Sequence, residues 1–106
     1  MFKLTVLYGH PADAAAFEAY YAQTHVPLAL KIPNLVRIEA AKATPPPDGK
    51  QAPYYRTADL WFENLEQLQA SLNSNEGKTA VGDLANFATG GVTTFTSEVT
   101  AAEGHL

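Results

Sequence analysis

The order in which strand-like and helix-like stretches follow one another constrains the fold of this chain most. Apolar and polar residues alternate at 2–8 (FKLTVLY) and predict a strand, because successive side chains of a strand point to opposite faces. Residues that favour helices follow Asp13, a good N-cap. Next come strand-like stretches at 35–42 and 54–63, a helical region in two parts at 64–87, and a β-branched stretch at 92–99.

This β-α-β-β-α-β order predicts the ferredoxin-like split βαβ fold, an α+β architecture with helices on one face of an antiparallel sheet. The opposite face of the sheet would then expose a large apolar patch. Two sheets packed face to face would cover that patch, so we expect a homodimer that forms a dimeric α/β barrel. The chain has 106 residues, and its length predicts a single domain over 1–106.

The stretch YYAQTHVPLAL, at 20–30, raises a question about the first helix. Proline lacks a backbone N–H and its ring clashes with the preceding helical turn, so Pro27 predicts that the helix ends near Thr24 or His25. A further short turn can start at Pro27. The Pro-rich stretch at 43–53 predicts an exposed loop. The polar residues at 101–106 predict a frayed tail.

Composition excludes several classes of function. The net charge is −4 and the seven basic residues are scattered, which argues against a nucleic-acid partner. No apolar run approaches the roughly 20 residues of a membrane span. Absence of cysteine removes disulfides, thiol nucleophiles and thiolate metal sites, and it fits a cytoplasmic location. His10 in a turn, and His105 in the tail, show no metal-ligand spacing with His25, so no metal is expected.

Two motifs in this sequence resemble those of a known family. The stretch YGHPADAAAFEAYYAQTHVPLALKIPNL at 8–35 and the stretch DLANFATGG at 83–91 are similar to the EthD family. The resemblance implies a dimeric α/β barrel that binds one small, largely apolar molecule between sheet and helices. Related barrels include isomerases, cyclases, decarboxylases and cofactor-free monooxygenases. No nucleotide-binding motif comes with the family or is visible here, so no cofactor is expected.

His25 is the candidate for chemistry. An imidazole can give or take a proton at neutral pH, which suits general acid–base catalysis. His25 follows Tyr21 by four residues, so the two side chains can share one helix face, and Tyr8 or Tyr21 would orient the substrate or stabilise oxyanion charge. Alternatively, His25 simply ends the helix, where a histidine interacts favourably with the last carbonyls. The sequence leaves both interpretations open.

Four further residues are candidates for substrate binding. Tyr8, Trp61 and Phe95 are candidates for an aromatic pocket, although ordinary core packing explains most aromatic residues equally well. Arg37 is a candidate for binding an anionic substrate group, and its alternative is a cross-strand ion pair. Asp13 and Asp83 are interpreted as structural residues.

Together these features predict a cofactor-independent enzyme that acts on a hydrophobic small molecule in catabolism or secondary metabolism. His25 would move a proton beside a carbonyl or lactone, in an isomerisation or an oxidation. The alternative is a non-catalytic carrier that binds a hydrophobic metabolite for a partner oxygenase. The scarcity of charged catalytic groups fits the carrier as well as it fits the enzyme.

Overall fold

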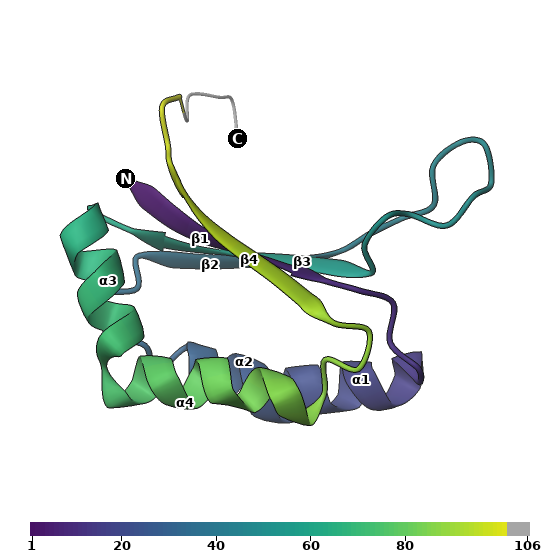
Figure 1. Ribbon diagram of the computed structural model, residues 1–106, viewed down its shortest axis with the longest axis horizontal. Coiled ribbons are helices and arrows are strands. Elements are labelled where there is room, and N and C mark those ends of the chain that lie inside the picture. The colour runs from purple at the N-terminus through teal and green to yellow at the C-terminus, as the bar shows by residue number, and fades with distance from the viewer. Residues whose placement is uncertain (102–106) are drawn as a thin grey trace.

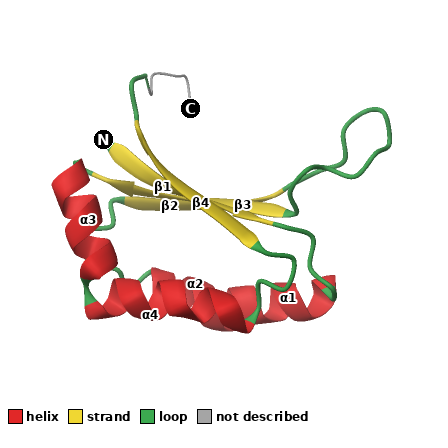
Figure 2. Cartoon of the chain, in the orientation of Figure 1, coloured by secondary structure: helices red, strands yellow, loops and turns green. Residues whose placement is uncertain are grey.

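A computed structural model describes residues 1–101 of the chain and shows an antiparallel sheet with helices on one face (Figures 1 and 2). The order of the strands across the sheet is β2-β3-β1-β4, and every neighbouring pair is antiparallel. The predicted α+β ferredoxin-like fold is therefore confirmed. The elements are β1 (Phe2–Tyr8), α1 (Ala14–Tyr20), η1 (Tyr21–His25), α2 (Val26–Ala29), β2 (Arg37–Lys42), β3 (Arg56–Phe62), α3 (Leu65–Asn73), α4 (Asn75–Asp83), η2 (Leu84–Asn86) and β4 (Val92–Glu98).

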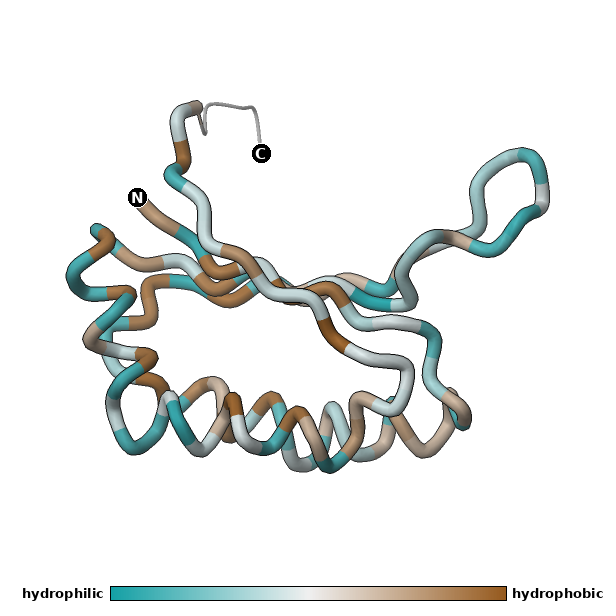
Figure 3. The backbone as a smooth tube through the Cα atoms, viewed as in Figure 1, coloured by the Kyte–Doolittle hydropathy of each residue, from teal (hydrophilic) through white to brown (hydrophobic). Residues whose placement is uncertain are grey.

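The core lies between the sheet and the helices. Alternate residues of β1 and β3 point toward the helices and are buried, among them Leu4, Val6, Leu60 and Phe62. Figure 3 shows apolar segments along the strands and on the helices below them. The residues between these positions point to the other face of the sheet, which the helices leave uncovered (Figure 1).

The first helix does not end at His25, so that prediction is wrong. The chain passes from α1 through one wide π-helical turn, η1, directly into α2, and Pro27 lies inside this continuous helix. The Val26 N–H donates to the Tyr21 carbonyl five residues back, and such a widened turn inside a helix is a π-bulge. The wider turn accommodates Pro27, which has no N–H to donate. As a consequence, His25 lies within the helix rather than at its end.

Side-chain caps divide the second helical region into two parts, as predicted. The Asn64 side chain accepts a hydrogen bond from the Gln67 N–H at the start of α3. The Ser74 hydroxyl accepts one from the Gly77 N–H at the start of α4. These caps satisfy amides that have no partner within the helix.

The double glycine before β4 allows a close approach between two parts of the backbone. The Gly9 N–H donates to the Gly91 carbonyl at 2.9 Å. A Cβ atom on Gly90 would lie 2.2 Å from the carbonyl oxygen of His10, so only glycine fits there. This contact brings the start of β4 beside the end of β1, next to the residues that form the cavity described below.

The stretch at 43–53 contains no helix or strand and extends from the body of the molecule as a loop (Figure 1). The predicted loop is therefore confirmed. Most of the predicted tail, including His105, lies outside the described residues. No helix within residues 1–101 is long and apolar enough to cross a bilayer.

Candidate functional site

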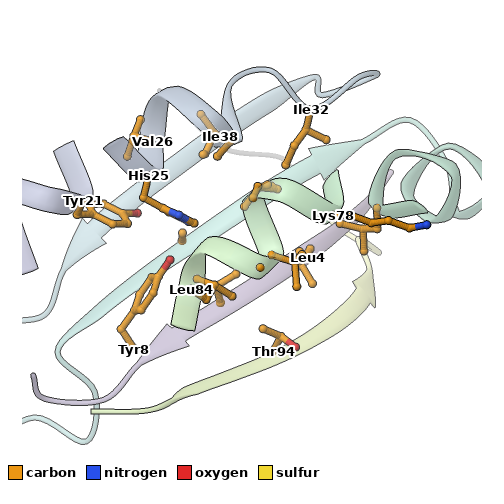
Figure 4. A pocket seen from close by; sticks show the side chains of 18 residues that line it. Leu4, Tyr8, Tyr21, His25, Val26, Ile32, Ile38, Lys78, Leu84 and Thr94 are labelled. Atoms are coloured by element: carbon orange, nitrogen blue, oxygen red, sulfur yellow. The ribbon is translucent and has the colours of Figure 1, made fainter. Parts of the chain in front are cut away.

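A cavity of about 540 Å³ lies between the sheet and the helices. Most of its wall consists of aliphatic side chains, and a few polar groups interrupt them (Figure 4). This volume falls within the range typical of small-molecule sites. Its lining comes from β1, η1, α2, the turn after α2, β2, β3, α3, α4, η2 and β4: Leu4, Val6, Tyr8, Tyr21, His25, Val26, Ala29, Ile32, Ile38, Ala58, Leu60, Leu72, Lys78, Ala80, Val81, Gly82, Leu84 and Thr94.

His25 lies in the cavity wall and is paired with a carboxylate behind it. Its side chain is buried, and Nδ1 lies 3.0 Å from Oδ2 of Asp83. The ring packs against Phe87, with 4.6 Å between the ring centroids. This contact and the pairing with Asp83 come from the second motif and fix the orientation of the ring. The interpretation of His25 as a simple helix end is therefore not supported by its position.

Asp83 is held in the charged form by its neighbours. Burial raises the pKa of this carboxyl, but hydrogen bonds from Tyr20, Asn86 and His25 oppose burial and together hold the pKa below its usual value. The Tyr20 hydroxyl donates at 2.6 Å, and the Asn86 side-chain N–H at 3.0 Å. An ionised carboxylate can only accept hydrogen bonds. In the neutral imidazole, His25 Nδ1 therefore carries the proton, and Nε2 is left free to accept one.

Two tyrosines stand beside the imidazole. Tyr8 and Tyr21 pack edge to face, with 5.6 Å between ring centroids, and Tyr21 stacks on His25 at 5.8 Å. Figure 4 shows both phenol rings at the same end of the cavity as His25. Burial raises the pKa of the Tyr8 hydroxyl far above its usual value, and the neighbouring Tyr21 adds to this effect. Burial also raises the pKa of Tyr21. Both hydroxyls therefore remain protonated and can donate hydrogen bonds to a ligand.

An arginine supports Tyr21 from outside the cavity. The Arg56 guanidinium lies 4.8 Å from the centroid of the Tyr21 ring, within the range of a cation–π contact. Arg56 also donates two hydrogen bonds to the Glu18 carboxylate, at 2.5 and 3.2 Å. This ion pair joins β3 to α1. It holds Arg56 against the face of the Tyr21 ring that is turned away from the cavity.

Trp61, Phe95 and Arg37 do not line the cavity, contrary to the prediction that they bind substrate there. Side chains alternate along a strand, and these three occupy the positions that face away from the helices, on β3, β4 and β2. The Arg37 guanidinium pairs with Glu39 at 2.5 Å and lies 5.8 Å from the centroid of the Trp61 ring. The alternative interpretation of Arg37, a cross-strand ion pair, is right about the ion pair but not about its placement, because Glu39 lies on the same strand, β2.

Asp83 is the residue whose part in the site the sequence analysis missed. The sequence alone indicates a structural residue, yet the Asp83 side chain is buried and holds His25. A signal was present in the sequence. The buried positions of α4 are Gly77, Ala80 and Asp83, so a carboxylate continues an inward stripe of small residues at helical spacing. A buried carboxylate needs partners, and a histidine on a facing helix is a natural one.

Among residues 1–101, no three His, Cys, Asp or Glu side chains gather closely enough to hold a metal ion. The polar groups at the cavity wall are instead an imidazole, phenols, one hydroxyl and one ammonium. They are suited to proton transfer and hydrogen bonding with an organic molecule.

Comparison with known proteins identifies the family. The model of the EthD domain matches residues 9–91, so the chain belongs to the EthD family. It is 44% identical to an uncharacterised 11.0 kDa protein in the thcB–thcC intergenic region of Rhodococcus erythropolis, over 94% of this chain and 97% of that one. The crystal structure of an EthD family protein from Bacillus halodurans matches with a TM-score of 0.89 and 32% identity, covering 94% and 99% of the two chains.

A more distant structure shares the fold. SnoaB, a cofactor-independent oxygenase from Streptomyces nogalater, matches with a TM-score of 0.64 and 15% identity, covering 95% of this chain and 93% of that chain. At this identity the match shows a common fold alone.

Proposed function

We propose that this protein is a cofactor-independent enzyme that binds a hydrophobic small molecule and moves a proton beside a carbonyl group of that molecule. The observation that carries this proposal is the Asp83–His25 pair in the wall of an otherwise largely apolar cavity. Apolar surroundings strengthen electrostatic interactions, and a substrate bound there is desolvated, so a proton acceptor in this wall acts on it outside bulk water. SnoaB, with the same fold, is described as cofactor-independent, which supports chemistry of this kind.

In this mechanism, His25 acts as the base. Nε2 takes a proton from the carbon next to the carbonyl, so that a C–H bond breaks and an N–H bond forms. Asp83 stabilises the imidazolium that results, as a carboxylate does behind a catalytic histidine. The hydroxyls of Tyr8 and Tyr21 donate hydrogen bonds to the enolate oxygen. Where a C=C bond adjoins this carbon, return of the same proton to the far end of that bond shifts the double bond and gives an isomer. Where molecular oxygen is the oxidant, the enolate carbon forms a C–O bond with it, and the outer oxygen of the resulting peroxide takes the proton from His25.

Hydrogen–deuterium exchange tests this proposal without knowledge of the natural substrate. 2-Tetralone is a small apolar ketone with exchangeable hydrogens beside its carbonyl, and NMR follows its deuteration in D₂O. We expect the protein to accelerate exchange and His25→Ala to abolish the acceleration. His10→Ala is the matched control, because His10 bonds to the Ala52 carbonyl and does not line the cavity. Equal acceleration by His25→Ala and the wild type would refute the proposal.

A carrier is the second candidate function. The observation that favours it is the lining of the cavity, in which aliphatic residues greatly outnumber polar ones. A carrier would bind 2-tetralone with measurable affinity and release it with its hydrogens unexchanged after long incubation. Binding without exchange therefore supports the carrier, and exchange that depends on His25 supports the enzyme.

We also propose that the chain forms one EthD-like domain and that two copies pair through the uncovered face of the sheet to form a dimeric α/β barrel. Trp61 and Phe95 lie on that face, and Phe95 is 49% exposed. The indole Nε1 of Trp61 is buried and has no hydrogen-bond partner within residues 1–101. Sedimentation velocity tests this proposal: Phe95→Lys should convert a dimer to monomers, and a monomeric wild type would refute it.

A further inference from the structure

The mouth of the cavity lies between α4 and the edge strand β4. Among the residues that line the cavity, ten are buried and four are half-buried, and the exposed ones come from these two elements alone: Lys78, Val81 and Gly82 from α4, and Thr94 from β4. Only one side of β4 is paired within the sheet, with β1. A ligand therefore enters between α4 and β4.

Lys78 carries a positive charge at this mouth. Carboxylates are absent from the residues that line the cavity, and no ion pair within residues 1–101 involves Lys78. Figure 4 shows the Lys78 side chain at the opposite end of the cavity from His25, with its nitrogen turned outward. Such a side chain covers apolar surface with its methylene groups while its ammonium stays in water.

The lysine at the mouth and the partner of His25 lie on the same helix. Lys78 and Asp83 are five residues apart on α4, which corresponds to about 7.5 Å along the helix axis. Asp83 in turn holds His25. One elongated molecule can therefore reach both the imidazole and the ammonium, with its middle part against the aliphatic side chains of Leu4, Leu60 and Leu72.

We infer that the ligand is an amphipathic carboxylate: its carbonyl group lies beside His25, and its carboxylate meets Lys78 at the mouth. This inference rests on the proposed function and defines its substrate class. The cation at the mouth contributes to specificity and takes no part in the proton transfer. Because the mouth is open to water, the ion pair should favour an acid over its uncharged analogue by about two- to fivefold.

A matched pair of probes tests this assignment. 7-Oxooctanoic acid places a ketone six bonds from a carboxylate, and 7-oxooctanamide has the same shape without the charge. Isothermal titration calorimetry gives both dissociation constants, at about 20 mM and about 300 mM salt, because added salt screens an exposed ion pair. We expect the wild type to prefer the acid at low salt and to lose much of this preference at high salt.

Three variants separate charge from packing. Lys78→Met keeps an apolar stem and should lose the preference for the acid without a change in affinity for the amide. Lys78→Arg should keep the preference. Lys31→Met is the control, because Lys31 is an exposed lysine that does not line the cavity, and it should behave as the wild type.

The outcomes distinguish the two proposals. If Lys78→Met retains the preference for the acid, or weakens acid and amide equally, the charge at the mouth has no role and this inference is refuted, while the proposed function stands. If neither probe binds the wild type and the exchange of 2-tetralone is not accelerated, both this inference and the proposed function fail. Accelerated exchange of 2-tetralone without any acid preference in the wild type would refute the inference alone.

Discussion

The two faces of the sheet are built from the same strands but have different chemistry. On β1, Leu4 and Val6 point to the helices and line the cavity, whereas Lys3 and Thr5 point to the uncovered face. There the Thr5 hydroxyl donates to the Asp59 carboxylate at 2.6 Å, and Lys3 lies 3.7 Å from the same group. Charges and hydroxyls thus satisfy one another across strands on the uncovered face, while the covered face is mostly apolar where it lines the cavity. One sheet can therefore hold a ligand site and also offer a surface to a partner.

A pair of phenylalanine substitutions tests this difference, and the first has the largest expected effect. Phe62 points to the helices and is fully buried, whereas Phe95 on the other face is 49% exposed. We expect Phe62→Ala to lower the free energy of unfolding by about 3–5 kcal/mol, because it leaves a cavity in the core. Phe95→Ala should cost well under half as much at protein concentrations low enough for the proposed dimer to dissociate. Urea denaturation measures both changes, and equal costs would contradict the assignment of the faces.

Asp83→Asn tests whether a carboxylate on the covered side of the sheet supports catalysis, in contrast to one on the uncovered face. The amide can donate a hydrogen bond as well as accept one, so it no longer forces the proton onto Nδ1 of His25. We expect the rate of 2-tetralone deuteration to fall by about 100-fold or more, because an amide behind a catalytic histidine leaves it in the wrong tautomer. Asp59→Asn is the matched control on the uncovered face and should leave the rate unchanged. Loss of activity in both variants would point to a general effect on folding.

Acid should weaken the contribution of Asp83 to stability. Its pKa in the folded chain is held below the usual value, so the carboxylate stabilises the fold above the ordinary aspartate pKa of about 3.9. This stabilisation disappears as the pH falls through the lower folded-state pKa. The difference in unfolding free energy between wild type and Asp83→Asn should therefore narrow from about pH 6 to about pH 2. Urea denaturation measures this difference in unfolding free energy. If it stays constant over this pH range, the lowered pKa assigned to Asp83 is contradicted.

The smallest predicted effect is a gain in stability from a substitution at one glycine of α4, and a second glycine of the same helix provides the control. A Cβ atom on Gly82 would meet nothing within 4 Å, although the residue lies at the cavity mouth. We expect Gly82→Ala to raise the free energy of unfolding by about 0.5–1 kcal/mol, because alanine favours the helix. A Cβ atom on Gly77 would lie 2.2 Å from the Ser71 carbonyl oxygen, so Gly77→Ala should destabilise the fold. Thermal unfolding of the two variants should show opposite shifts.

The sequence predicted the order of the elements and the residues at one end of the cavity. The periodicity of FKLTVLY and the caps at Asp13 and Asn64 are local features, so they could be recognised without the tertiary structure. Tyr8, Tyr21 and His25 line one cavity in the structure, as their placement at a strand end and on one helix face predicted. Their roles in binding and catalysis stay predictions.

The remaining features depend on tertiary context. Adjacent apolar residues at 61 and 62 give no sign of which one faces the helices, and the direction of the pleat follows from pairing between strands. Pro27 ends a regular helix by its local chemistry, but packing of both halves of the helix on the sheet favours a widened turn instead. The pairing of Asp83 with His25 joins residues 58 positions apart, which no local pattern reports.

The central claim is that His25 presents an unprotonated Nε2 to a cavity that a small molecule can enter. Long-range ¹H–¹⁵N NMR spectra at about pH 8, above the ordinary imidazole pKa of about 6.5, report the tautomer of each histidine directly. We predict that Nδ1 of His25 carries the proton and that 2-tetralone shifts the Nε2 resonance of His25 but not that of His10. A proton on Nε2, or a His25 signal that saturating 2-tetralone leaves unchanged, would contradict the claim.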